Sequence, residues 1–359
     1  MVINMENINE ILKGSNVKID ELSKYISKSG VCVHPRIGRK RNKVSLPKAL
    51  MGTVSAADEA EDTEFYNEYI NQGTISLIPK SDEKKLISIE TSVRSKVSQL
   101  AIACDNTFMT ADVYANEYLP YFNQKKKEYF EKRDEIVAKW DLLVDVFKTK
   151  LNAYFDRRNI INKQELMKNI ISNIPTKNEF SSSFYMELRL TAFPVEENID
   201  MFSSTLAAQV KNSITETKMD FIVEMMGNLL GDAFNNLNKM LLFYRDNGEI
   251  KNQQMKYVKT MKKSLVKNNL LGLDMINDII NDITALENIS IDEYDEIAEN
   301  AESILVKTYG FIKDTNLDSF IDTTNLAITE MDMARAYVMI NPNSTVVKSM
   351  LNMDTEETA

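Results

Sequence analysis

Apolar residues at heptad spacing are the feature that most restricts the fold of this chain. After Val137 they recur at steps of three and four residues, as Trp140, Val144, Phe147, Leu151 and Tyr154. This spacing places the side chains on one face of an α-helix, where they can pack against a neighbouring helix. It therefore predicts long amphipathic helices, with Trp140 in the core.

Helix-breaking residues are scarce, which favours a small number of long helices. The 359 residues include 10 Gly and 7 Pro, about 5% together, against roughly 12% in average proteins. Folds rich in tight turns, such as β-sandwiches, need more of both. Apolar stripes predict helices over about 82–104, 112–154, 197–244, 250–286, 292–312 and 316–340. We therefore expect a predominantly all-α fold, an elongated antiparallel bundle of long coiled-coil-like helices.

The N-terminal region has a different pattern from the rest. Alternating β-branched residues predict a short strand over 31–38, a loop over 38–57 and a second extended piece over 73–79. Residues 3–29 have helical spacing interrupted at Gly14. The predicted organisation is thus an N-terminal region with a small α/β element (1–80), a long-helix bundle (81–345) and a frayed C-terminal tail (346–359).

Charge reverses abruptly within the N-terminal region. Residues 51–70 hold six acidic residues and no basic one, whereas residues 31–50 hold no acid and six bases. Two solvated stretches that partly neutralise each other are one interpretation. A basic docking arm for an acidic partner is the other. The candidate interaction residues are Arg36, Arg39, Lys40, Arg41, Lys43 and Lys48.

The residues that common catalytic sites require are mostly missing from the sequence. His34 is the single histidine, and Cys32 lies two residues away. A catalytic Cys-His pair would also need a third group to support it, and none accompanies these two residues. The sequence contains no HExxH, no GxxxxGKS/T and no GxGxxG pattern. The acids of 292–296 start a helix, where its dipole favours them. We expect no enzyme, no catalytic residues, no cofactor and no metal.

Overall charge and hydropathy restrict the partners and the cellular location that we expect for the chain. A formal net charge of -10 and a pI of about 5.0 disfavour a nucleic-acid-binding surface. The first residues lack the basic and apolar regions of a signal peptide. No window of about 18 apolar residues could span a membrane. The expected location is the cytoplasm.

The sulfur-containing residues are interpreted as buried side chains. Cys32 and Cys104 are far apart in sequence and form no CxxC motif, so we expect two reduced thiols and no disulfide scaffold. The 19 methionines fall mostly on apolar stripes. Core filling is therefore preferred over an adaptable binding surface.

One set of features in residues 31–155 is shared with a known group of proteins. It comprises the extended piece and basic turn of 31–40, the segment 73–79, the helix with Arg94, the pair Phe108-Met109, and the helix of 118–154 with Trp140-Asp141. This pattern, over about a third of the chain, resembles a family of uncharacterised phage and prophage proteins. The family has no established catalytic residues.

The resemblance implies a phage-encoded protein made in the cytoplasm of a bacterial host. Genes of this family are often found beside MoxR-type AAA+ ATPases and von Willebrand A-type proteins, which implies an adaptor role in an ATP-driven remodelling complex. We expect a non-enzymatic helical adaptor or scaffold that binds such an ATPase or its client. The alternatives are a phage structural or assembly protein that self-associates as a homo-oligomer, and a nucleic-acid-associated protein that uses segment 36–48.

Overall fold

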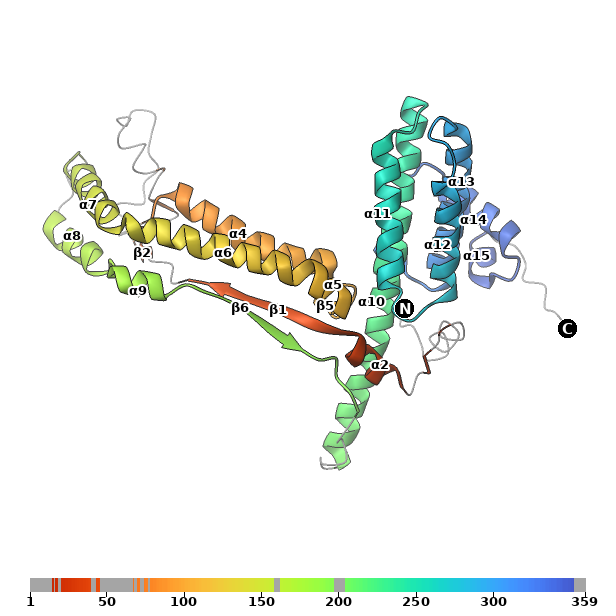
Figure 1. The fold of residues 1–359 in the computed structure, drawn as a ribbon, viewed down its shortest axis with the longest axis horizontal. Coiled ribbons are helices and arrows are strands. Elements are labelled where there is room, and N and C mark those ends of the chain that lie inside the picture. Colours follow the sequence, from red (N-terminus) through yellow and green to blue (C-terminus); the bar gives the residue numbers. More distant parts are fainter. Residues whose placement is uncertain are drawn as a thin grey trace. The chain divides into compact units, whose positions relative to one another are not determined.

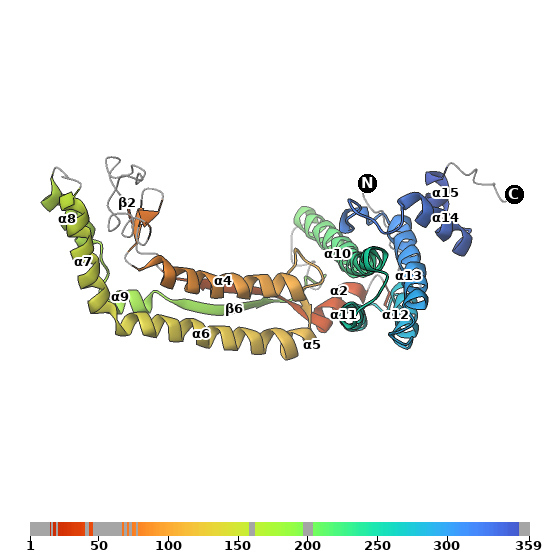
Figure 2. The ribbon, with the colours of Figure 1, turned by 90° about the horizontal axis from the view of Figure 1, so that it is seen from above.

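A computed structural model describes residues 15, 17–18, 21–39, 43–45, 67, 70–71, 74–76, 78–157, 162–196 and 204–351. Helices occupy most of these residues, and a small three-stranded antiparallel sheet has the order β5-β1-β6 (Figures 1 and 2). The predicted class, predominantly all-α with a small α/β element, is confirmed. The strands are β1 (Gly30–Gly38), β2 (Lys43–Ser45), β3 (Ile70–Asn71), β4 (Thr74–Ser76), β5 (Phe108–Thr110) and β6 (Tyr185–Thr191).

The chain divides into two compact units. Unit 1 contains Met1–Cys32, Leu100–Tyr114 and Thr191–Ala359, and unit 2 contains Val33–Gln99 and Ala115–Leu190. The predicted boundaries at residues 80 and 345 do not coincide with this division, because the proposed bundle 81–345 contributes to both units. The two units differ from the predicted regions because segments distant in the sequence contact each other. Strand β1, for example, pairs with β5 and not with a sequence neighbour.

Four helices of unit 1 form a closed bundle. They are α10 (Ser204–Asn247), α11 (Asn252–Asn268), α12 (Asp274–Glu287) and α13 (Tyr294–Asp314). Each contacts the next, and α13 returns to contact α10. The connections are short, so successive helices run antiparallel, as the green-to-blue ribbons of Figure 1 show. With 44 residues, α10 is about 66 Å long at 1.5 Å per residue.

Two glycines allow a loop to lie close against α10. Gly227 and Gly231 are about one helical turn apart, and the short 3₁₀ helix η5 (Asp318–Phe320) packs over them. A Cβ on Gly227 would lie 2.4 Å from the Phe320 ring, and one on Gly231 would lie 2.5 Å from the Phe320 carbonyl oxygen. Only a residue without a side chain fits such an approach.

Asn238 of α10 then holds the loop that follows η5. Its side chain is 5% exposed. Its amide nitrogen donates to the Asn325 carbonyl and its amide oxygen accepts from the Ala327 N–H, both at 2.8 Å. This loop occupies the first part of the helix predicted over 316–340, and α14 begins only at Glu330 (Glu330–Ile340). A following helix, α15 (Thr345–Met350), occupies the start of the predicted frayed tail, and residues 352–359 lie outside the described residues.

Two other predicted helices are also interrupted. The segment 112–154 forms α5 (Ala111–Val113), the π-helical turn η3 (Tyr114–Tyr118), α6 (Leu119–Ala138) and α7 (Trp140–Arg157). The segment 250–286 divides between α11 and α12, where Gly272 has a φ of 64°. Apolar spacing predicted that these segments are helical but did not predict where the helices end.

The helices α4 (Lys80–Leu100) and α6 run antiparallel in unit 2. Asp82 and Lys132 form an ion pair of 2.8 Å near one end, and Lys96 lies over the Tyr121 ring near the other. Figure 2 shows the two helices in orange and yellow, side by side. Trp140 is buried and stacks on Phe180 at 4.4 Å between ring centroids, which confirms its predicted place in the core.

The remaining elements complete the two units. α2 (Leu22–Ser29) precedes β1, and the first helix predicted within residues 3–14 lies outside the described residues. The predicted strand over 31–38 and the extended piece over 73–79 are confirmed as β1 and β4, whereas β2 falls in the predicted loop and β6 was not predicted. A second small sheet has the order β2-β4-β3. The other helices are α8 (Lys163–Ser172) and α9 (Lys177–Ser182).

Gly310 tests the packing of α13 against α14. A Cβ at this position would lie 2.1 Å from the Tyr337 ring, and this ring is fixed because its hydroxyl donates to Asp314 at 2.9 Å. Gly310→Ala should lower the free energy of unfolding by about 1–3 kcal/mol through overpacking, although alanine favours helix by about 1 kcal/mol. Urea denaturation measures the change. Ser303→Ala, at an exposed position of α13, is the control, and equal midpoints for both variants would contradict the packing.

Candidate functional site

The candidate basic residues do not share one environment. Arg36 is exposed on β1, whereas Arg39 directly after β1 has a side chain that is only 2% exposed. Lys43 lies in β2, whose backbone pairs with β4 opposite Ser76. Lys40, Arg41 and Lys48 lie outside the described residues.

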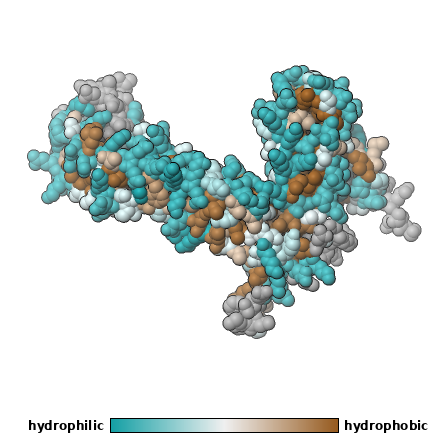
Figure 3. Space-filling view, in the orientation of Figure 1, coloured by the Kyte–Doolittle hydropathy of each residue, from teal (hydrophilic) through white to brown (hydrophobic). Residues whose placement is uncertain are grey.

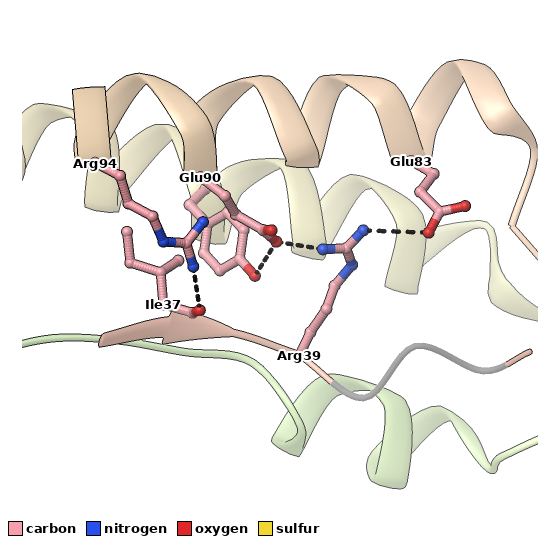
Figure 4. A network of polar contacts seen from close by, with 6 residues as sticks. Ile37, Arg39, Glu83, Glu90 and Arg94 are labelled. Carbon is pink, nitrogen blue, oxygen red and sulfur yellow. Dashed lines mark hydrogen bonds and ion pairs between the residues drawn. The ribbon is translucent and has the colours of Figure 1, made fainter. Parts of the chain in front are cut away.

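Arg39 is the centre of a buried polar network in unit 2 (Figure 4). Its guanidinium donates to the Glu90 carboxylate and lies 3.7 Å from Glu83, both on α4. The Glu90 side chain is 5% exposed and that of Glu83 is 10% exposed. The Tyr129 hydroxyl of α6 donates to the same Glu90 oxygen at 3.0 Å.

The network connects three elements that are separate in the sequence. Arg39 follows β1, the two carboxylates belong to α4, and Tyr129 belongs to α6. Arg94 of α4 adds a hydrogen bond of 2.8 Å to the Ile37 carbonyl of β1. Burial, reinforced by the Glu90 charge, raises the pKa of Tyr129. The phenol therefore stays protonated and acts as a donor to Glu90.

Two acidic residues in the apolar stripe of α4 are a sequence signal for this network. Buried α4 residues follow heptad steps, as Glu83, Leu86, Glu90, Val93 and Val97. Two acids thus occupy positions of the apolar stripe. A carboxylate at such a position needs a buried cation or donors, since an isolated charge is costly to remove from water. Arg39 fills this role, so its side chain is not part of an exposed docking arm, whereas the exposed Arg36 remains a candidate.

A second candidate surface lies on α14 and α15. Thirteen large apolar side chains are exposed among the described residues, and five of them fall within 331–350. Met339 is the most exposed, at 85%. Figure 3 shows brown and tan atoms over these two helices. We call this group the C-terminal apolar patch; it comprises Met331, Met339, Ile340, Val346 and Met350.

The patch has a firm base and charged neighbours of both signs. Buried Met333, Ala334 and Tyr337 anchor α14, buried Val347 anchors α15, and both helices contact α13. The first turn of α14 carries Glu330 and Asp332. Asp332 pairs with Arg335, Glu330 pairs with Lys313, and Lys348 lies in α15. Large apolar side chains exposed together on fixed elements are typical of protein-interaction surfaces.

A groove lies between α10 and α11 in unit 1. It has a volume of about 410 Å³ and is lined by Asn236, Lys239, Met240, Phe243, Gln254 and Tyr257. These side chains supply no nucleophile with a neighbouring base. Among the described residues, no three His, Cys, Asp or Glu side chains are grouped to hold a metal ion, and no helix is long and apolar enough to cross a membrane.

Comparison with known proteins found no matching family model, no matching curated protein and no matching solved structure. The resemblance to the phage family therefore stays an expectation from the sequence. The polar network and the C-terminal apolar patch are the two features on which a function can be argued.

Replacing Arg39 tests the buried network. Arg39→Met leaves the Glu90 carboxylate buried without its cation, which should lower the free energy of unfolding by about 3–5 kcal/mol. Adding Glu90→Gln to this variant should recover most of the loss, because the uncompensated charge is then gone. Urea denaturation followed by circular dichroism measures the change. Arg36→Met is the control for a neighbouring exposed arginine, with an expected change of about 0.5 kcal/mol or less. The network is refuted if Arg39→Met and Arg36→Met unfold at the same urea concentration.

Proposed function

We propose that this chain is a non-enzymatic adaptor or scaffold that binds a partner protein through the C-terminal apolar patch. The observation that supports this proposal is the exposure of Met331, Met339, Ile340, Val346 and Met350 on two short helices. Methionine side chains are flexible and polarizable, so they can adapt to the surface of a partner. This interpretation assigns three of the 19 methionines to binding instead of to the core.

Charge favours a different protein as the partner over a second copy of this chain. The whole chain has a formal net charge of -10, and the first turn of α14 carries Glu330 and Asp332 beside the patch. Association of two such acidic chains brings net negative charges together, which costs free energy. Around the patch, Asp332 pairs with Arg335, and Lys348 lies in α15, so the expected partner presents an apolar surface with neighbouring charges of both signs.

The first partner to test comes from the family resemblance. It is a MoxR-type AAA+ ATPase, or a client of that ATPase, in the cytoplasm of a bacterial host. Arg36, with Lys40, Arg41, Lys43 and Lys48, is proposed as a second contact for an acidic segment. Arg39 belongs to the buried network and is left out of that contact.

A structural or assembly protein of a phage particle is the second candidate. The same patch would then join copies of this chain into a homo-oligomer, and association would depend on protein concentration alone. A nucleic-acid-associated protein that uses the basic segment is the third candidate. Its affinity would fall steeply with salt concentration, because counterions are released on binding.

The patch is tested by a tagged pull-down from the native (phage-infected) cells, followed by binding measurements on the purified partner. Met339→Lys with Val346→Lys should weaken binding of a co-purified ATPase at least about tenfold, which corresponds to 1.4 kcal/mol. The new charges would be buried at the interface without a partner, which costs free energy.

The matched control is Leu142→Lys, a similar change at a position of α7 that is 65% exposed. Circular dichroism establishes that each variant is folded. Equal binding by the patch variant and the control would contradict the proposed surface. Recovery of capsid or tail proteins, or of this chain alone, would favour the structural alternative.

A further inference from the structure

The fold brings the two cysteines of the chain together within unit 1. Cys32 lies in β1 opposite Phe108 of β5. The chain turns back between Ala103 and Phe108, which form an isolated antiparallel bridge. Cys104 begins this turn, and its thiol is hydrogen-bonded to the sulfur of Cys32. Two thiols that are 72 positions apart in sequence are therefore neighbours in the fold.

The turn that carries Cys104 has an unusual backbone and is held by α10. Cys104, Asp105 and Asn106 have φ angles of 56°, 53° and 58°, a left-handed conformation that residues other than glycine rarely adopt. The Glu224 carboxylate of α10 accepts a hydrogen bond from the Asp105 N–H at 3.1 Å. Thr107 closes the turn through its hydroxyl, which donates to the Cys104 carbonyl at 2.6 Å. These contacts keep Cys104 facing Cys32.

The two sulfurs have different surroundings. Cys32 is 8% exposed and belongs to the apolar core of unit 1, whereas Cys104 is half-buried, so solvent reaches the pair from its side. The hydrogen bond from Cys104 lowers the pKa of Cys32 to about 7, with help from Thr107 and Thr191 and against the effect of burial. The same hydrogen bond, burial and the nearby carboxylates raise the pKa of Cys104.

We propose that Cys32 and Cys104 are a reversible oxidation site, at which a peroxide converts the two thiols into an intramolecular disulfide. The Cys32 thiolate attacks one peroxide oxygen and the O–O bond breaks. Hydroxide is the leaving group, and Cys32 becomes a sulfenic acid. The Cys104 sulfur then attacks the Cys32 sulfur, the S–O bond breaks, and the oxygen leaves as water with the Cys104 proton. Two electrons pass from the thiols to one hydrogen peroxide, which becomes two molecules of water.

The disulfide would act at the point where the chain leaves unit 1 and returns to it. Cys32 is the last residue of unit 1 before the excursion Val33–Gln99, and Cys104 follows the return at Leu100. A bond between them closes a long loop of the unfolded chain and reduces its conformational freedom. Oxidation should therefore raise the melting temperature of the full chain, independently of any partner.

Mass spectrometry of the full-length protein tests this site. The protein is treated with an equimolar amount of hydrogen peroxide and then alkylated under denaturing conditions. We expect a loss of two hydrogens, two thiols that no longer react, and a tryptic cross-link that joins the Cys32 and Cys104 peptides. Dithiothreitol should restore both thiols. Oxidation should be half-maximal in rate near pH 7, because the thiolate of Cys32 is the reacting form and its fraction rises with pH.

Two single variants separate the disulfide from other oxidation. Cys104→Ser should leave a Cys32 sulfenic acid that dimedone traps, with no internal cross-link and no rise in melting temperature. Cys32→Ser should slow oxidation at least about tenfold at pH 7, because burial and the nearby carboxylates still raise the pKa of the remaining thiol. Circular dichroism checks that both variants fold. The proposal is overturned by two freely alkylated thiols after peroxide treatment, or by disulfides that form only between chains.

Discussion

The ion pair between Arg39 and Glu90 is the contact on which the packing of unit 2 depends. Both side chains are almost fully excluded from water, so each charge would be strongly unfavourable without the other. Their pairing requires the end of β1 to lie beside α4, and the hydrogen bond from Tyr129 requires α6 to lie there as well. Apolar packing alone tolerates sliding of one helix along another, whereas this network specifies a single register.

Unit 1 obtains its specificity from close backbone approach and from amide hydrogen bonds. Gly227 and Gly231 allow Phe320 to pack directly on α10, and Asn238 satisfies two backbone groups of the following loop. The loop thereby leads the chain to α14 at a defined place on the bundle. The C-terminal apolar patch is presented on helices that are themselves anchored by buried residues, which limits the entropy that binding a partner would cost.

Helical periodicity predicted the elements of this protein better than their limits. The stripes over 82–104 and 197–244 correspond closely to α4 and α10. The breaks at Lys139 and at 269–273 were not predicted. Heptad spacing continues through Lys139, whereas Asn268, Asn269 and Gly272 interrupt the apolar stripe at the second break. Strand β6 was also not predicted. The segment alternates apolar Met186, Leu188 and Leu190 with polar residues, which is a strand pattern, and it lies beside β1 in the sheet.

The sequence by itself determined the helical class, the short strand over 31–38 and the burial of Trp140, because local periodicity states which face of an element avoids water. Only the tertiary structure decided which charged residues are buried and which cysteines meet. Arg39 resembles its basic neighbours in sequence, yet its side chain is buried and pairs with acids on α4. Cys32 and Cys104 become neighbours through the register of β1 and β5, since pairing between distant strands depends on the whole chain and leaves no mark at either residue.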